Sequence, residues 1–511
     1  MVSGFSLTFM VSFPDFMPSQ LFQTKSLDVL VSEAEIPQHQ LKRTLGAFDV
    51  TMLGIGAIVG AGIFATIGTA TAGDAARPGA GPALILSFVL TAVACGFAAL
   101  CYAEFAAMVP ISGSAYTYAY ATLGELIAWI IGWDLIIEYA VGNVAVAISW
   151  GNYFKTLVSG FGIVIPDWIS TDYRTAAKIP GLLESAPHIL GVPIVFNILA
   201  FGIVAALTVV LVIGIRESAA LNTGMVILKL IVLGFFVGVG WAHMNPDNWH
   251  PFAPNGWQGI QAGAAIVFFA YIGFDAVSTV AEECRNPERD LPIGIVGSLI
   301  ICTIIYIVVA AVFTGIIPYK VLVTKLATEQ AEPLTMALQY ANLGNFVVGV
   351  VAFGSVVAHT AVLLVFQLGQ PRIFFSMARD GLLPASFARV HPRFRTPHVT
   401  TILTGVAVGV CAMFTSIDEM VDLTNIGTLF AFILVCLGIL ILRKRDPGRR
   451  RAFKTPFVPL VPVLGILSCG YLMLGLPLIT WVRFGLWLLV GLVIYFVYGM
   501  KRSGLRRETS G

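Results

Sequence analysis

Apolar runs about as long as a lipid bilayer is thick alternate with short polar connections along the chain. A helix needs roughly 20 mostly apolar residues to cross ~30 Å of hydrocarbon. Twelve such runs lie at residues 47–72, 83–108, 121–150, 192–213, 220–242, 258–282, 292–316, 341–369, 398–416, 421–442, 457–480 and 483–500. We therefore predict an all-α, polytopic membrane protein with twelve transmembrane helices.

Lysine and arginine are distributed unevenly between the connections, and this predicts the orientation. If the N-terminus is inside, the inside segments hold 22 of these residues and the outside segments hold 7, with Lys229 alone inside a span. Positive charge is concentrated on the cytoplasmic side of membrane proteins. We expect a multi-pass protein of the cell (cytoplasmic) membrane with both termini cytoplasmic. Residues 1–44 are then a cytoplasmic leader, 45–502 the transmembrane domain and 503–511 a cytoplasmic tail.

Composition agrees with a lipid environment and excludes several functional classes. Of the 511 residues, 57% are hydrophobic and 11% are charged, whereas soluble domains carry roughly 25% charged residues. The net charge of +2 gives no reason to expect a nucleic-acid partner. The seven cysteines form no CxxC motif, and the sequence contains no catalytic constellation. We expect no enzyme activity, no metal and no cofactor.

The first span carries four glycines, at Gly54, Gly56, Gly60 and Gly62. Each weakens a helix by roughly 1 kcal/mol relative to alanine. Backbone at membrane depth is left outside a helix only where it lines a cavity in the protein. The run therefore indicates a break whose free N–H and C=O groups bind something. It also fits close helix packing, and the first span alone does not decide between the two.

The sixth span repeats the pattern, because Gly273 lies in mid-membrane next to Asp275. If the first ten helices form two halves of five, at about 47–242 and 258–442, the first and sixth spans correspond, and two extra helices follow at about 457–500. Interrupted helices in matching halves indicate a transporter's substrate site. Half-helix amides suit a carboxylate and free carbonyls suit an ammonium, so an amino acid matches both.

Lys229 lies near the middle of the fifth span. A lysine near a helix end can extend its amine to the interface, but Lys229 is roughly 15 Å from either end. Ionisable groups at this depth mark functional sites, and a buried lysine can alternate between ammonium and amine. We interpret Lys229 as a proton coupler whose ammonium can also stand where a sodium ion would bind.

Carboxylates in the spans have several interpretations. Asp134 and Glu138 share one face of the third span, and Glu138 would either meet a cationic substrate group or a buried water, or pair with a backbone donor or Lys229. Asp275 is expected to hold the sixth-span break open by accepting backbone N–H bonds. His359 is interpreted as a hydrogen-bonded core histidine. Glu104, at the end of the second span, is expected at the membrane interface.

These residues resemble the amino acid–polyamine–organocation superfamily, and within it the bacterial cationic amino acid transporter-like permeases. The resemblance extends from about Leu41 to Arg502 and rests on an ordered set of motifs. They are LGAFD at 45–49, GAIVGAGIF at 56–64, YAE at 102–104, PISGSAY at 110–116, FAYIGFD at 269–275, EE at 282–283, NP at 286–287, LP at 291–292, GI at 294–295, GQPR at 369–372, RDGLLP at 379–384, FVP at 457–459 and VP at 461–462. The resemblance implies a LeuT-like inverted repeat of five plus five helices, two further helices, and amino-acid uptake.

The resemblance also implies a substrate site at the two breaks. The site would comprise Ile58, Gly60, Ala61, Gly62, Phe269, Ala270 and Ile272, together with Glu138, with Gly56, Gly273 and Asp275 in support. Amides around Ala61 and Gly62 would bind the substrate carboxylate. The substrate amine would bind the carbonyls of Ile58, Phe269, Ala270 and Ile272. Lys229 matches the fifth-helix lysine that fills the sodium position in proton-coupled members. Ala61 replaces a hydroxyl residue found in many relatives.

We therefore predict a proton-coupled importer of L-amino acids that works by alternating access, with the amino acid, the proton and membrane lipid as its partners. The alternatives are an exchanger or sodium symporter on the same scaffold, and a non-transporting amino-acid sensor. A major-facilitator fold is disfavoured, because it requires a long loop after the sixth span and only residues 283–291 are available. The sequence carries no indication for or against a small membrane subunit.

Overall fold

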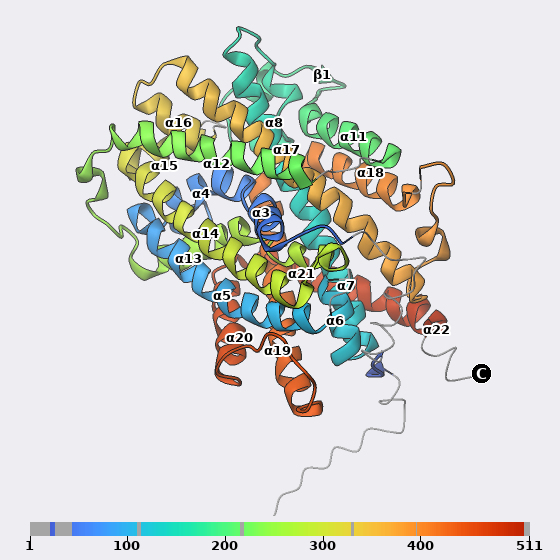
Figure 1. Cartoon of the computed structure of the whole chain (residues 1–511). Coiled ribbons are helices and arrows are strands. Elements are labelled where there is room, and N and C mark those ends of the chain that lie inside the picture. The colour runs from blue at the N-terminus through green and yellow to red at the C-terminus, as the bar shows by residue number, and fades with distance from the viewer. Residues whose placement is uncertain are drawn as a thin grey trace, which may run out of the picture.

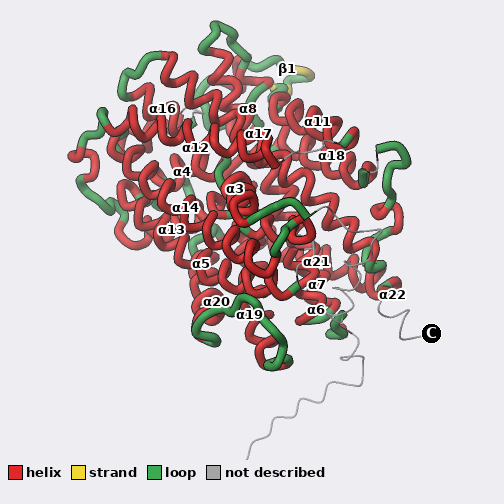
Figure 2. The backbone as a smooth tube through the Cα atoms, in the orientation of Figure 1, coloured by secondary structure: helices red, strands yellow, loops and turns green. Residues whose placement is uncertain are grey.

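The computed structural model describes residues 21–25, 43–109, 114–214, 219–328, 332–394 and 396–504. This part of the chain is mostly helical (Figures 1 and 2). It contains one short antiparallel hairpin, β1 (His188–Ile189) and β2 (Val192–Pro193). The prediction of an all-α fold is therefore wrong for these few residues, which lie in a connection between apolar helices.

Nine stretches of the described residues are long and apolar enough to cross a membrane, which confirms a polytopic membrane protein. They span Ala47–Ala72, Gly81–Met108, Glu125–Ser159, Asn222–Trp241, Gly256–Glu283, Pro287–Ile316, Asn345–Arg379, Ile417–Arg445 and Leu478–Arg502. Three shorter apolar helices, Ile198–Ile213, His398–Phe414 and Leu460–Met473, coincide with the predicted fourth, ninth and eleventh spans.

The helical elements of the first half are α3 (Ala47–Ile58), η1 (Gly62–Thr66), α4 (Ile67–Ala72), η2 (Gly81–Ala83), α5 (Leu84–Met108), α6 (Ser114–Thr122), α7 (Glu125–Ile136), η3 (Ile137–Val141), α8 (Gly142–Ser159), η4 (Asp167–Ile169), α9 (Tyr173–Ala176), α10 (Leu182–Ser185), α11 (Ile198–Ile213) and α12 (Ala219–Trp241). The elements η1 and η3 are π-helical turns, each within a candidate span. Such turns interrupt regular helices and occur frequently at functional sites.

The second half contains η5 (Pro246–Trp249), α13 (Gly256–Val267), η6 (Phe268–Tyr271), η7 (Asp275–Glu283), α14 (Pro287–Ile316), α15 (Tyr319–Thr328), α16 (Pro333–Tyr340), α17 (Asn345–Arg379), η8 (Ala385–Ala388), α18 (His398–Phe414) and α19 (Ile417–Arg445). The helices that follow are α20 (Leu460–Met473), α21 (Leu478–Ile494), η9 (Tyr495–Gly499) and α22 (Met500–Arg502).

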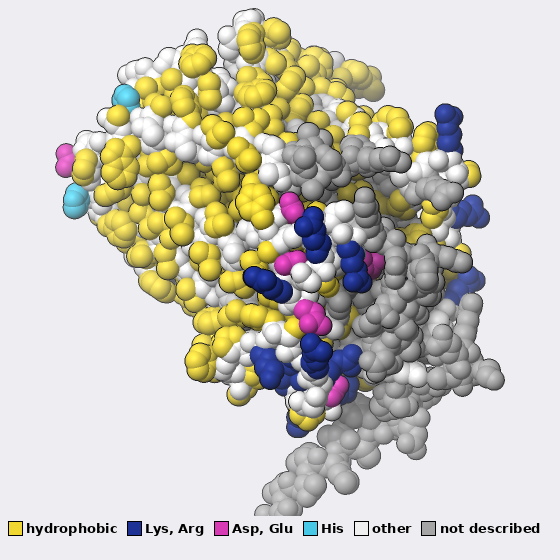
Figure 3. All heavy atoms as spheres, in the orientation of Figure 1, with side chains coloured by type: hydrophobic (Ala, Val, Ile, Leu, Met, Phe, Trp, Pro, Cys, Tyr) yellow, Lys and Arg dark blue, Asp and Glu magenta, His cyan; other side chains and the backbone are white. Residues whose placement is uncertain are grey.

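The first span lies near the middle of the bundle, with other helices around it (Figure 1), and most of its residues are buried. Helix α14 packs against both α3 and α5, α17 packs against α8 and α12, and α11 packs against α18. Apolar side chains cover the face that α5, α12, α13 and α14 present, while lysine and arginine gather at one end of the view (Figure 3). A broad apolar face of this kind suits lipid contact, and the broken spans are enclosed behind it.

Glu104, near the end of α5, is fully buried, and its partners come from the end of α19 and the connection that follows it. Arg443 binds it in a bidentate pair, with Nε 2.8 Å from Oε1 and Nη2 2.9 Å from Oε2. Arg451 adds a third cationic contact at 3.1 Å, and the backbone N–H of Thr455 donates at 2.8 Å. This carboxylate therefore fixes the basic loop after α19 to the second span.

Replacing the Glu104 carboxylate tests this connection. We expect Glu104→Gln to lower the free energy of unfolding by about 3 kcal/mol, since removing one partner of a buried ion pair leaves the other charge uncompensated. The thermal unfolding midpoint of the purified protein in detergent measures the change. Glu288→Gln, at an exposed position in the first turn of α14, is the matched control. Equal midpoints for the two variants would contradict the assignment.

Candidate functional site

Both predicted helix breaks are present. Helix α3 ends at Ile58, Val59 has an extended conformation with ψ of 100°, and helical structure resumes at Gly62. In the sixth span η6 ends at Tyr271, Ile272 is extended, and Gly273 has a φ of +121° that favours glycine. The backbone therefore leaves the helical conformation at buried positions in both spans, which confirms the interpretation of the glycine run as a break.

The two breaks touch each other. A Cβ added to Gly62 would lie 2.1 Å from the Cα of Ala270, and one added to Gly273 would lie 2.9 Å from the carbonyl of Ala57. No side chain fits at either position, so glycine is required for the backbones to meet. The alternative of close packing also holds for the first span, because a Cβ at Gly60 would lie 2.6 Å from Val362 and one at Gly56 would lie 3.0 Å from Val226.

Lys229 closes the end of the first half-helix. Its side chain is 0% exposed, and Nζ donates to the carbonyl of Gly56 at 2.7 Å and to that of Val59 at 2.9 Å. The last carbonyls of a helix have no partner within it, and an ammonium with three N–H donors can bind several of them. The amine is therefore held at the break instead of extending to the interface.

Tyrosine and asparagine side chains bind further carbonyls around the breaks. Tyr306 on α14 donates to the carbonyl of Ile58 at 3.0 Å, and Tyr153 on α8 donates to that of Phe64 at 2.7 Å. Asn425 on α19 donates to the carbonyl of Ala265 at 2.8 Å. Sequence reasoning missed these residues, although a polar atom inside an apolar span is a detectable signal. The Ile58 carbonyl, expected to face a substrate amine, faces Tyr306 in this conformation.

The remaining predicted site residues lie at the same junction. Phe269 and Ala270 belong to η6, Ile272 lies in the extended link, and Ala61 precedes η1. All four are buried. The structure thus brings the predicted backbone positions of both spans together in one enclosed region.

Glu138, on the π-helical turn η3, meets another carboxyl group. It is 2% exposed and lies next to Asp275, at the start of η7, which is 0% exposed. Asp134 lies farther along the same face and is also buried. Asp275 lies beside the backbone of Gly273 and Ala276. Neither of its carboxyl oxygens has a hydrogen-bond partner among the described residues, so the predicted bonds from backbone N–H groups are not formed in this conformation. Two adjacent buried carboxyl groups repel when both are ionised, so this pair suits a proton or a cationic group.

His359 on α17 is hydrogen-bonded as a core histidine. Its Nε2 lies 2.8 Å from Ser149 Oγ and its Nδ1 lies 2.6 Å from the carbonyl of Ser355. The ring contacts Phe64 and Tyr153, with centroid separations of 5.8 and 5.5 Å. It therefore packs against the second half of the first span, which begins at η1.

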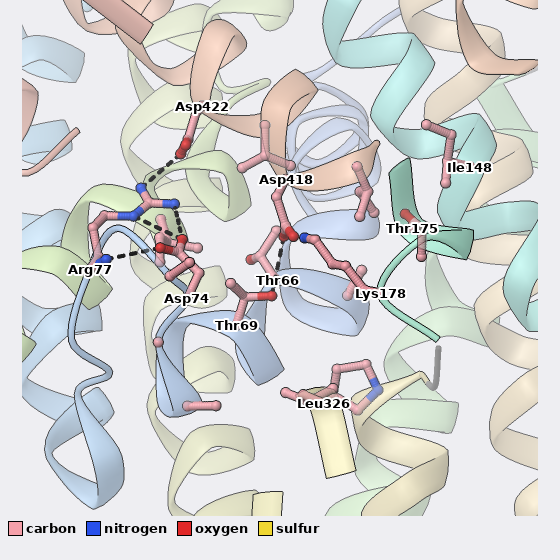
Figure 4. Close-up of a pocket in the computed structure, with 18 of the residues that line it drawn as sticks. Thr66, Thr69, Asp74, Arg77, Ile148, Thr175, Lys178, Leu326, Asp418 and Asp422 are labelled. Atoms are coloured by element: carbon pink, nitrogen blue, oxygen red, sulfur yellow. Dashed lines mark hydrogen bonds and ion pairs between the residues drawn. The ribbon is translucent and has the colours of Figure 1, made fainter. Parts of the chain in front are cut away.

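A cavity of about 540 Å³ lies against η1 and α4, the second half of the first span (Figure 4). Thr66 of η1 lines it and donates to the carbonyl of Gly62 at 2.5 Å. The ionisable side chains that line it are Asp74, Arg77, Lys178, Glu332, Asp418 and Asp422. The cavity therefore places charged side chains of α19 and of the connecting segments beside η1 and α4, and hydropathy could not indicate it.

Arg77 joins two elements across this cavity (Figure 4). Its Nη1 lies 2.8 Å from Asp422 on α19 and its Nη2 lies 2.7 Å from Asp74 in the loop after α4. Burial alone would lower the pKa of Arg77, but the two carboxylates together hold that pKa above its usual value. The guanidinium therefore stays charged and links the loop after α4 to α19.

Comparison with known proteins identifies the family. Residues 45–498 match the family described as "Amino acid permease". The branched-chain amino acid permease BcaP of Bacillus subtilis is 47% identical over 491 residues, which cover 96% of this chain and 100% of that protein. The methylthioribose transporter of the same organism is 42% identical, with 96% of this chain and 100% of that protein covered.

A plant relative extends the comparison. The vacuolar cationic amino acid transporter 4 of Arabidopsis thaliana is 37% identical over 80% of this chain and 64% of its own length. The family match and these relatives are transport proteins and not enzymes. The chain therefore belongs to the amino acid permease family of the amino acid–polyamine–organocation superfamily.

Proposed function

We propose that the chain is a proton-coupled importer of L-amino acids in the cytoplasmic membrane, with twelve spans in a five-plus-five inverted repeat and two additional helices. The observation that carries the proposal is the contact between two broken spans, with Lys229 bound to the end of one. Half-helix termini that meet in mid-membrane offer amides and carbonyls to the two charged groups of an amino acid. Alternating access then moves this site between the two sides.

The substrate is placed by backbone groups of both breaks. Its carboxylate binds amides at Gly60, Ala61 and Gly62, where the second half-helix begins. Its ammonium binds carbonyls of Phe269, Ala270 and Ile272. Ile58 contributes only when Tyr306 releases its carbonyl, since the tyrosine hydroxyl now donates to it at 3.0 Å. The direct contact between Gly62 and Ala270 represents a closed site that must separate to admit a substrate.

Lys229 couples this movement to a proton. As an ammonium it makes charge-assisted hydrogen bonds to the carbonyls of Gly56 and Val59, and these bonds are roughly twice as strong as neutral ones. Loss of the proton weakens both and frees α3 from α12. The charge of Lys229 therefore biases one state of the first span against another. Glu138 and Asp275 provide a second place for positive charge at the sixth span.

The substrate class is a neutral aliphatic amino acid. The relative with the highest identity quoted above carries the name of a branched-chain amino acid permease. The side chain that packs against the first break at Gly60 is apolar, since a Cβ there would lie 2.6 Å from Val362. Leucine, lysine and methylthioribose offered to proteoliposomes with and without an inward proton gradient test this. Accumulation of lysine alone would overturn the substrate class, and exchange without accumulation would favour an antiporter.

Lys229→Met tests proton coupling. The thioether keeps much of the side-chain volume but cannot donate to the carbonyls of Gly56 and Val59. We expect gradient-driven accumulation of leucine to be lost, while exchange of labelled for unlabelled leucine persists. Uptake into proteoliposomes with a pH gradient and counterflow without one measure the two activities. Accumulation equal to that of the wild type would exclude Lys229 as the coupling residue.

Gly62→Ala tests the meeting of the two breaks. A Cβ at this position would lie 2.1 Å from the Cα of Ala270, whereas one at Gly96 would have no neighbour within 4 Å. Both changes add one methyl group inside a predicted span. We expect Gly62→Ala to reduce leucine transport about tenfold or more, since small displacements at a reacting or binding centre have large effects, and Gly96→Ala to leave it unchanged. Equal transport by the two variants would remove Gly62 from the site.

A further inference from the structure

Glu332 is a buried carboxylic acid that the proposed transport mechanism does not use. It precedes α16, where its backbone carbonyl accepts from Met336 N at 2.9 Å and Thr335 Oγ1 at 2.9 Å. The residue is 4% exposed and lines the charged cavity, and its Oε2 has no hydrogen-bond partner. A buried carboxylate with an unpartnered oxygen is costly, whereas the neutral acid is not.

The surroundings of Glu332 connect it to the broken first span. Pro333, the next residue, packs on α4 so closely that a Cβ at Gly68 would lie 2.6 Å from its Cγ. Asn152 and Tyr153 of α8 are the polar side chains that act on the Glu332 carboxyl, although its Oε2 has no hydrogen-bond partner in this conformation. Tyr153 in turn donates to the Phe64 carbonyl at 2.7 Å. A change at Glu332 therefore reaches η1 through a single side chain.

A tyrosine hydroxyl has one proton to donate, and this makes the connection sensitive to the charge of Glu332. When Glu332 is neutral, it can donate to the Tyr153 oxygen, and Tyr153 continues to donate to Phe64. When Glu332 is ionised, its carboxylate can accept a hydrogen bond from the Tyr153 hydroxyl. The carboxylate then competes with the Phe64 carbonyl for that one donor. Burial raises the pKa of Glu332 to about 8, and the polar side chains of Asn152 and Tyr153 act against this rise.

We propose that Glu332 is a proton-binding site reached from the cavity, and that its neutral form keeps Tyr153 bound to the outer half of the first span. The cavity opens to the outside in the proposed orientation, and the inference rests on the proposed transport function. The other charged or titratable groups around Glu332 come from several elements. His359 lies behind Tyr153 on α17, Lys320 and Lys325 are on α15, and Asp74, Arg77, Lys178, Asp418 and Asp422 line the cavity.

The test compares the wild type with Glu332→Gln, whose amide is neutral and can still donate to Tyr153. Leucine counterflow is measured in proteoliposomes with the same pH on both sides, over a range that includes the expected midpoint. In the wild type we expect KM to rise about fivefold above a midpoint near pH 8, the ratio that loss of one hydrogen bond of about 1 kcal/mol produces. Glu332→Gln is expected to keep the low KM throughout.

Two further variants separate the outcomes. Glu184→Gln, which changes an exposed side chain on α10, should retain the wild-type pH profile. Tyr153→Phe should show the high KM at every pH, because the bond to Phe64 is absent whatever the charge of Glu332. The inference is overturned if Glu332→Gln follows the wild-type pH profile. If Glu332→Gln does not fold, the inference is overturned when Tyr153→Phe follows that profile. Counterflow needs no proton gradient, so the test remains valid even if Lys229 does not couple transport to protons. Absence of leucine counterflow in the wild type would instead contradict the transport function itself.

Discussion

The need to satisfy backbone hydrogen bonds at membrane depth governs this structure. Each unpaired N–H or C=O in hydrocarbon costs several kcal/mol, yet the first and sixth spans both leave the helical conformation at buried positions. Side chains from other helices supply the missing partners. Lys229 of α12, Tyr306 of α14 and Tyr153 of α8 each donate to a carbonyl of the first span. The broken helix is therefore stable only as part of the whole bundle.

The same partners make the break responsive. A continuous helix satisfies its own backbone, so neighbouring helices can slide along it without breaking hydrogen bonds. Here a movement of α12 or α14 relative to α3 must exchange specific bonds at Gly56, Ile58 or Val59. Two discrete arrangements are favoured over continuous deformation, because partly broken bonds in a low-dielectric interior are unfavourable. This is the physical basis for two access states in the proposed mechanism.

The sequence predicts those features that depend on local pattern. Hydropathy alone locates the apolar helices, and glycine content locates the breaks at Gly60 and Gly273, since length and backbone freedom are properties of single segments. The burial of Lys229 follows from its distance to either end of the span. Contacts between distant segments could not be predicted in this way. Tyr306 at the Ile58 carbonyl, Glu104 beneath Arg451, and the cavity charges depend on which helix faces which.

The two broken spans also differ in the charge placed beside them, and this difference bears on coupling. The first span has an ammonium, Lys229, directed at carbonyl oxygens. The sixth span has a carboxyl pair, Glu138 and Asp275, next to the start of a half-helix. The ammonium form of Lys229 makes charge-assisted hydrogen bonds to its two carbonyl partners, whereas the carboxyl pair is relieved of repulsion by gaining a proton. Protonation therefore strengthens the packing around both breaks in the closed arrangement. In the proposed mechanism a proton thus favours closure around the substrate, and its release favours reopening.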